Sequence, residues 1–243
     1  MFFFLLPLLP ALPILCVYIA AALLPAVLLL RYIYRHDTVE KEPAPLLASL
    51  LLMGVLAAVC SGVLEGIGQS VLQLLVAPTR PIYTVLMAFL VVAAVEEGTK
   101  FFFLKRRTWN HPAFNYRFDG VVYAVFVSLG FAAIENVEYV FSYGLSVALP
   151  RALLSVPGHM AFSVFMGAFY GRARLYADLG DDGACRRCLW GGYLTAVLLH
   201  GFYDTCAMMG GGLSLLVFGV FVAVTFFAAY RTVKRESATD APV

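Results

Sequence analysis

The chain is poor in charged residues and has no cysteine framework. Only 13% of its 243 residues are charged, against 62% hydrophobic, which is far outside the range of soluble globular proteins. The net charge of +2 does not indicate nucleic-acid binding, because Lys and Arg fall at the ends of apolar segments. We therefore expect no nucleic-acid partner. The five cysteines show no disulfide pattern, and Cys185 with Cys188 is a lone CxxC pair, whereas structural zinc needs four ligands.

Long apolar runs fill most of the sequence. A helix needs about 20 residues to cross the hydrocarbon core of a bilayer. The chain supplies about seven such runs once embedded charges are allowed, with short loops between them. We therefore expect an all-α polytopic bundle in a lipid bilayer, with residues 1–243 forming one domain. The expected spans cover about 2–30, 46–76, 82–104, 120–142, 149–171, 189–209 and 213–230.

The distribution of Lys and Arg predicts the orientation of this bundle. If the N-terminus is outside, fourteen of these residues fall on the inner side, and only Arg80 and Arg151 remain outside. Such an excess follows the positive-inside rule. We expect the N-terminus outside, the C-terminus in the cytoplasm, and Cys185 and Cys188 in a reducing compartment.

Charged residues are embedded in the third expected span. Glu96, Glu97 and Lys100 lie inside an apolar segment that continues through Phe101 and Leu104. A charge at the middle of a membrane helix costs about 2.5–3.5 kcal/mol on insertion scales. Lys100 follows Glu96 by four residues and Glu97 by three, so it can pair with either carboxylate. Adjacent glutamates point about 100° apart, so we expect one to face a site while the other supports it.

Three later spans carry polar residues that match these charges. The fourth span contains Glu135, Asn136 and Glu138, and Asp119 before it is expected to be a helix N-cap. The fifth contains His159 directly after Pro157 and Gly158, which weaken the helix there. In the sixth, His200 and Asp204 are four residues apart, which lets the carboxylate orient the imidazole.

Each of these polar residues alone could be a helix-to-helix hydrogen bond. Left unpaired, the set of carboxylates, one lysine and two histidines would cost on the order of ten kcal/mol or more. We therefore expect the set to line one polar cavity within the membrane. A glutamate there, beside an imidazole oriented by an acid, could activate water to attack an amide carbonyl. The sequence lacks HExxH, a GxSxG-like serine and the GxGD motif of other intramembrane proteases.

The ordered motifs resemble one bacterial family. EExxK (Glu96, Glu97, Lys100), FxxxE (Phe131, Glu135), an embedded His159 and HxxxD (His200, Asp204) are similar to those of the PrsW intramembrane proteases, as is the loop 37–43. The resemblance covers about residues 31–209 and implies kinship with the type II CAAX prenyl endopeptidases. It also implies a bacterial cytoplasmic membrane location and site-1 cleavage of membrane-anchored anti-sigma factors. By motif, it implies that the catalytic set is Glu96, Glu97, Glu135, His159, His200 and Asp204.

The mechanism expected from these residues has two forms. Glu97, with Glu96 as the alternative, is the general base for a water, and Lys100 tunes the glutamates. His159 and His200 either polarise the scissile carbonyl without a metal or, with Glu97, bind Zn²⁺. Asp204 orients His200 in both forms, and Asn136 has a supporting role. The alternatives from other classes are a proton-coupled transporter and a catalytically inactive scaffold of the same fold.

Overall fold

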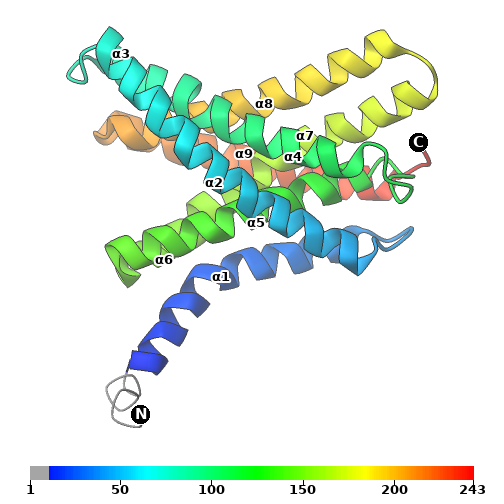
Figure 1. Cartoon of the computed structure of the whole chain (residues 1–243), viewed down its shortest axis with the longest axis horizontal. Helices are drawn as coiled ribbons and strands as arrows, with labels where there is room; N and C mark the ends of the chain where they lie inside the picture. Colours follow the sequence, from blue (N-terminus) through cyan, green and yellow to red (C-terminus); the bar gives the residue numbers. More distant parts are fainter. Residues whose placement is uncertain (1–10) are drawn as a thin grey trace.

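The computed structural model describes residues 11–243, in which seven helical rods run back and forth between two ends of a bundle (Figure 1). The described residues contain no β-strand, so the all-α prediction is confirmed. Residues 2–10 of the first expected span lie outside the described part. Five rods are single helices: α1 (Ala11–His36), α2 (Ala44–Leu75), α5 (Asp119–Tyr143), α8 (Asp182–Met209) and α9 (Gly212–Ala238). The third rod along the chain consists of α3 (Pro81–Leu86), η2 (Met87–Ala93) and α4 (Ala94–Thr108). The fifth consists of η3 (Leu145–Val147), α6 (Ala148–Pro150), η4 (Arg151–Ser155) and α7 (Val156–Asp178).

Among the described residues, six of these rods are long and apolar enough to cross a membrane. The seventh, α8, has 28 residues but carries charges at both of its ends. Several helices run further than the expected spans: α4 ends at Thr108, α7 at Asp178 and α9 at Ala238. Spans assigned from hydropathy end at the first basic residues, whereas the backbone hydrogen bonds of a helix continue through such residues. These extensions lie at the end of the bundle that holds the C-terminus (Figure 1).

Helix α5 is the most deeply buried rod, and the rod that ends in α7 is the next. Glycines allow α5 to approach its neighbours closely. A Cβ atom added at Gly54 of α2 would lie 2.1 Å from the Val127 carbonyl oxygen of α5, and one at Gly167 of α7 would lie 2.5 Å from the Gly120 oxygen. Small residues of this kind let membrane helices pack backbone to backbone. This packing holds α2, α5 and α7 around the polar residues described below.

A second group of buried carboxylates lies at the end of the bundle that holds the C-terminus. Asp37 is 1% exposed and Glu42 is 5% exposed. The Tyr123 hydroxyl donates a hydrogen bond to Glu42 Oε2 at 2.6 Å. Burial raises the pKa of Asp37 to about 6 and that of Glu42 to about 7. Asp37 and Glu42 do not contact the polar residues at the centre of the bundle. Their role is therefore structural.

The prediction that Asp119 caps α5 is wrong. The N-cap residue of α5 is Phe118, and Asp119 is the first residue of the helix. Its Oδ2 atom accepts hydrogen bonds from the amides of Asn115 and Tyr116, at 3.0 and 2.7 Å, which precede the helix. The carboxylate therefore fixes the loop before α5 instead of the first turn of the helix.

Candidate functional site

Polar side chains from four rods meet inside the bundle. Each rod contributes residues that the sequence had singled out: Glu96, Glu97 and Lys100 from α4, Glu135 from α5, His159 from α7, and His200 and Asp204 from α8. Direct hydrogen bonds or ion pairs link all seven into one group. The expected convergence of these residues is present in the structure, although their roles remain predictions.

Lys100 lies at the centre of this group. Its Nζ atom is 2.9 Å from Glu96 Oε2, 2.8 Å from Glu97 Oε1 and 3.1 Å from His159 Nδ1. The side chain is 3% exposed. A lysine ammonium has three donors and no acceptor, so Nδ1 of His159 must accept this hydrogen bond. The ammonium therefore balances two buried carboxylates and leaves His159 neutral at Nδ1.

His159 uses its other ring nitrogen to contact α5. Its Nε2 atom lies 2.8 Å from Glu135 Oε2. With Nδ1 as an acceptor, Nε2 carries the proton and donates it to this carboxylate. The Phe131 ring packs 5.7 Å from the imidazole, centroid to centroid. Glu135 thus fixes the tautomer and orientation of His159.

His200 on α8 is also held at both ring nitrogens, but both of its partners are carboxylates. Its Nδ1 atom lies 2.9 Å from Glu97 Oε1, and its Nε2 atom lies 3.3 Å from Asp204 Oδ2. The Phe162 ring stacks on the imidazole at 5.1 Å and 23°. The expected contact between Asp204 and His200 is therefore present. Each histidine directs one nitrogen to the α4 charges and the other to an outer carboxylate, which is the pattern of metal-ligating histidines.

Four residues of this group could hold a metal ion. One ligand atom from each of Glu96, Glu97, His159 and His200 lies within 4.8 Å of the others, and all four residues are buried. Glu97 Oε2 is buried and has no hydrogen-bond partner among the described residues. A buried oxygen without a partner indicates an ion or water that completes the site. Two imidazoles and a carboxylate are also the donor types of a catalytic zinc site. The donor atoms of these residues are therefore of the types that bind zinc.

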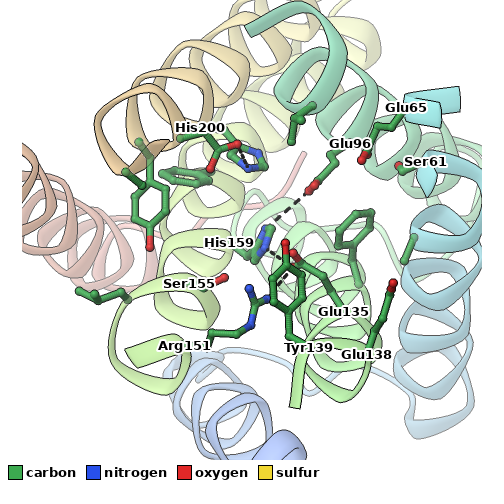
Figure 2. A pocket seen from close by; sticks show the side chains of 18 of the residues that line it. Ser61, Glu65, Glu96, Glu135, Glu138, Tyr139, Arg151, Ser155, His159 and His200 are labelled. Atoms are coloured by element: carbon green, nitrogen blue, oxygen red, sulfur yellow. Dashed lines mark hydrogen bonds and ion pairs between the residues drawn. The ribbon is translucent and has the colours of Figure 1, made fainter. Parts of the chain in front are cut away.

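A cavity of about 700 Å³ opens over the group. Figure 2 shows Glu96, Glu135, His159 and His200 around it, with Glu65 of α2 beside Glu96. Its lining continues past Glu138, Met208 and Leu215, which lie where α5 and α8 end and α9 begins. The cavity therefore connects the polar group to the end of the bundle where α5 and α8 end.

The two adjacent glutamates differ in their access to this cavity. Glu96 lines it and is 6% exposed, whereas Glu97 is 0% exposed and is not part of the lining. As expected from the angle of about 100° between adjacent residues of a helix, only one of the two glutamates faces the cavity. Glu97 holds both Lys100 and His200 through Oε1. The glutamate that can contact water in the cavity is Glu96, which the sequence had ranked second.

A π-helical segment, whose turns are wider than those of an α-helix, precedes each of Glu96 and His159. The π-helical segment η2 (Met87–Ala93) ends just before Glu96, and η4 (Arg151–Ser155) ends shortly before His159. Such π-helical turns often occur at functional sites. Pro157 itself lies in the first turn of α7, where its missing N–H is tolerated. The irregularity expected at Pro157 is therefore displaced to the segment that precedes it.

Asn136 and the cysteine pair lie outside the central group. The Asn136 side chain donates to the Ala22 carbonyl of α1 at 2.7 Å and accepts from Arg151 Nε at 2.8 Å. Cys185 and Cys188 lie in the first turns of α8 as free thiols. Asn136 therefore reaches the site only through Arg151.

Sequence reasoning missed Arg151. The charge distribution places it among the residues of the outer side, but its side chain is 13% exposed and NH2 lies 3.0 Å from Glu135 Oε2. Its guanidinium also lies 3.9 Å from the centroid of the Tyr139 ring (Figure 2). No local pattern of the sequence indicated this contact, because eight residues of a regular α-helix place Arg151 and His159 about 80° apart.

Comparisons with known proteins find one family. Residues 42–230 match the family model described as PrsW family intramembrane metalloprotease. Protease PrsW of Geobacillus kaustophilus is 33% identical over 224 residues, which are 92% of this chain and 94% of that protein. Protease PrsW of Bacillus subtilis is 32% identical over an alignment of 197 positions, and the alignment covers 76% of this chain and 80% of that protein. No solved structure gives a significant match.

Proposed function

Because the chain belongs to the PrsW family of intramembrane proteases, we propose that its buried Glu–His group hydrolyses a peptide bond of a membrane-anchored protein. The chain is accordingly a multi-pass bacterial membrane protein. The observation that carries the proposal is the cavity: Glu96, His159 and His200 line the same 700 Å³ space. A carboxylate and two oriented imidazoles beside a water-accessible space are the groups that amide hydrolysis requires.

In the proposed mechanism, Glu96 is the general base, because it contacts the cavity where water and the scissile carbonyl would meet. It takes a proton from water as the water attacks the carbonyl carbon, and it returns that proton to the leaving amine. His159 and His200 lie beside this carbonyl, and either stabilises the negative charge on its oxygen by turning its Nε2–H away from Glu135 or Asp204. Glu97 and Lys100 hold these groups in place, and Asp204 and Glu135 orient the two imidazoles.

The family description names a metalloprotease, and the donor set fits zinc in kind. His159, His200 and Glu97 would hold the ion, which would supply Lewis acidity for the scissile carbonyl. We expect 1,10-phenanthroline to abolish cleavage by the purified protein and Zn²⁺ to restore it. Full cleavage by protein that metal analysis shows to be zinc-free would assign the reaction to the glutamate and histidines alone.

The proposed substrate is a membrane-anchored protein, such as an anti-sigma factor, cut near the outer face of the cytoplasmic membrane. Two observations support this side. The cavity lining reaches Glu138, Met208 and Leu215 at one end of the bundle. The charge distribution assigns that end to the outside, because basic residues accumulate at the opposite end.

The proposed function is tested in host membranes. A strain lacking the gene is complemented with the wild-type chain or with Glu96→Gln, and new protein N-termini are identified by mass spectrometry. We expect new termini at the outer juxtamembrane segments of single-span proteins in the wild-type sample alone. A purified substrate of this group should then be cut in liposomes. Identical termini in both samples would overturn the proposal.

A further inference from the structure

Arg151 has three contacts on one face of α5. Its NH2 atom lies 3.0 Å from Glu135 Oε2, its Nε donates to Asn136 Oδ1 at 2.8 Å, and its guanidinium covers the Tyr139 ring at 3.9 Å. These partners all come from one stretch of α5. They fix both the position of the guanidinium and the orientation of its plane. Asn136 is itself bound to the Ala22 carbonyl of α1. The arginine is therefore anchored to two helices besides its own.

The oxygen that Arg151 contacts is the one that holds His159. Glu135 Oε2 lies 2.8 Å from His159 Nε2 and 3.0 Å from Arg151 NH2. The carboxylate is therefore held by a hydrogen bond from His159 and by the charge of Arg151, whose NH2 atom makes an ion pair with the same oxygen without a hydrogen bond. Without the arginine, the Glu135 side chain, which lines the cavity and is 20% exposed, would be held by His159 alone.

The wide turn of η4 makes this sharing possible. Eight residues separate Arg151 from His159, and in a regular α-helix they would span about 2.2 turns and point about 80° apart. A π-helical turn holds more residues, so the five π-helical residues of η4 bring the two side chains closer to one face. Both then reach the same carboxylate on α5.

We propose that Arg151 is a positioning residue for the cleavage reaction: it fixes Glu135 so that Glu135 holds the His159 imidazole toward Glu96 and Lys100. This inference rests on the proposed function, since it concerns the turnover of the same site. A role limited to balancing the Glu135 charge would need only the ion pair. The added contacts to Asn136 and Tyr139 instead restrict the orientation of the guanidinium, which is what positioning requires.

The test compares Arg151→Gln and Arg151→Lys with the wild-type chain in liposomes on one membrane-anchored substrate. Losing an outer partner of a catalytic or metal-ligating histidine typically costs about 10- to 100-fold in activity. We expect Arg151→Gln to lower kcat by about this factor with KM unchanged. Arg151→Lys keeps the charge but cannot form the planar contacts to Glu135 and Asn136 together, so its kcat should fall at least about fivefold. Arg80→Gln, in an exposed turn, is the control and should match wild type.

Two further measurements separate positioning from a structural role. In a Glu135→Gln background, Arg151→Gln should cause less than about a twofold further loss of kcat, because the two residues act through one contact. Guanidinium ions at low millimolar concentration should restore part of the kcat of Arg151→Gly within the assay, which a structural defect would not allow.

The inference is overturned if Arg151→Lys retains full kcat, or if the losses of Arg151→Gln and Glu135→Gln multiply. It is also overturned if Arg151→Gln lowers kcat only in proportion to its folded fraction. A wild-type chain that cuts no substrate would reject the proposed function instead, so the two failures are distinct.

Discussion

The ammonium of Lys100 lies 3.1 Å from Nδ1 of His159, although 59 residues separate them in the sequence. This contact joins α4 to α7 and requires Nδ1 to be the unprotonated nitrogen. It also shows how three charges of α4 are accommodated, because one lysine is shared by two carboxylates and one imidazole. Lys100 is thus a central element of the site, beyond the tuning role that its spacing from Glu96 and Glu97 suggests.

Replacing Lys100 by Met should destabilise the protein strongly. Two buried carboxylates would lose their shared partner, and removing one member of a buried ion pair typically costs about 3–5 kcal/mol. The free energy of unfolding is measured by titration of the lipid-reconstituted protein with denaturant. Adding Glu96→Gln should recover part of the loss, because one buried charge is then removed. The exposed Lys234→Met is the control, and a Lys100→Met protein as stable as this control would contradict the account.

Replacing Asp204 by Asn should lower turnover by about 10- to 100-fold while the fold remains. Asp204 Oδ2 is 3.3 Å from His200 Nε2, and an amide holds the imidazole less firmly than a carboxylate does. Cleavage rates and melting temperatures are compared with those of Asp178→Asn, which removes only a surface pair with Arg174. Equal rates for the two variants would show that Asp204 has no part in orienting His200.

Replacing Gly54 by Ala should destabilise the contact between α2 and α5. The added Cβ would lie 2.1 Å from the Val127 carbonyl oxygen, and backbone atoms there cannot move aside. Overpacking of this kind costs typically about 1–3 kcal/mol. Gly62→Ala on the same helix is the matched control, since a methyl group added there would have no heavy atom of a neighbouring element within 4 Å. Equal melting temperatures of the two variants would contradict the close packing.

Stability should fall as pH rises, through Asp37 and Glu42. Burial raises the pKa of Asp37 from 3.8 to about 6 and that of Glu42 from 4.5 to about 7. Nearby Glu40 adds to both shifts, whereas Lys41 opposes that of Asp37. The folded state thus binds more protons than the unfolded state between about pH 4 and pH 7, so the unfolding free energy decreases across this window.

Melting temperatures between about pH 5 and pH 8 test this prediction, because the slope of stability with pH reports the difference in bound protons. Asp37→Asn combined with Glu42→Gln should flatten the slope. The amide of Gln can still accept the Tyr123 hydrogen bond, so the local contact is preserved. A wild-type slope that persists in the double variant would assign the pH dependence to other groups.

The sequence predicted the parts of the fold that depend on hydropathy and spacing. The seven rods follow from the apolar runs, and the pairs Glu96–Lys100 and His200–Asp204 follow from separations of four residues. Because unpaired charges are costly in lipid, the meeting of α4, α5, α7 and α8 could also be predicted.

Contacts that depend on helix rotation or on local widening could not be predicted. Only the packing of α4 determines that Glu96 faces the cavity while Glu97 is buried. The π-helical segment η4 carries Arg151 onto Glu135, and no local pattern indicated such a turn. Likewise, the residue type of Asp119 predicts an N-cap, but its carboxylate accepts hydrogen bonds from backbone amides of the loop before α5.

The central claim is that residues from four rods form one hydrolytic site in which a cavity-facing glutamate deprotonates water. The most direct measurement is the cleavage rate of a purified membrane-anchored substrate in liposomes by the wild-type chain and by Glu96→Gln, with the exposed Glu40→Gln as control. Loss of a general base lowers turnover by about 10²–10⁴-fold. We predict such a loss for Glu96→Gln at an unchanged melting temperature, and no loss for Glu40→Gln. Undiminished cleavage by folded Glu96→Gln would contradict the account.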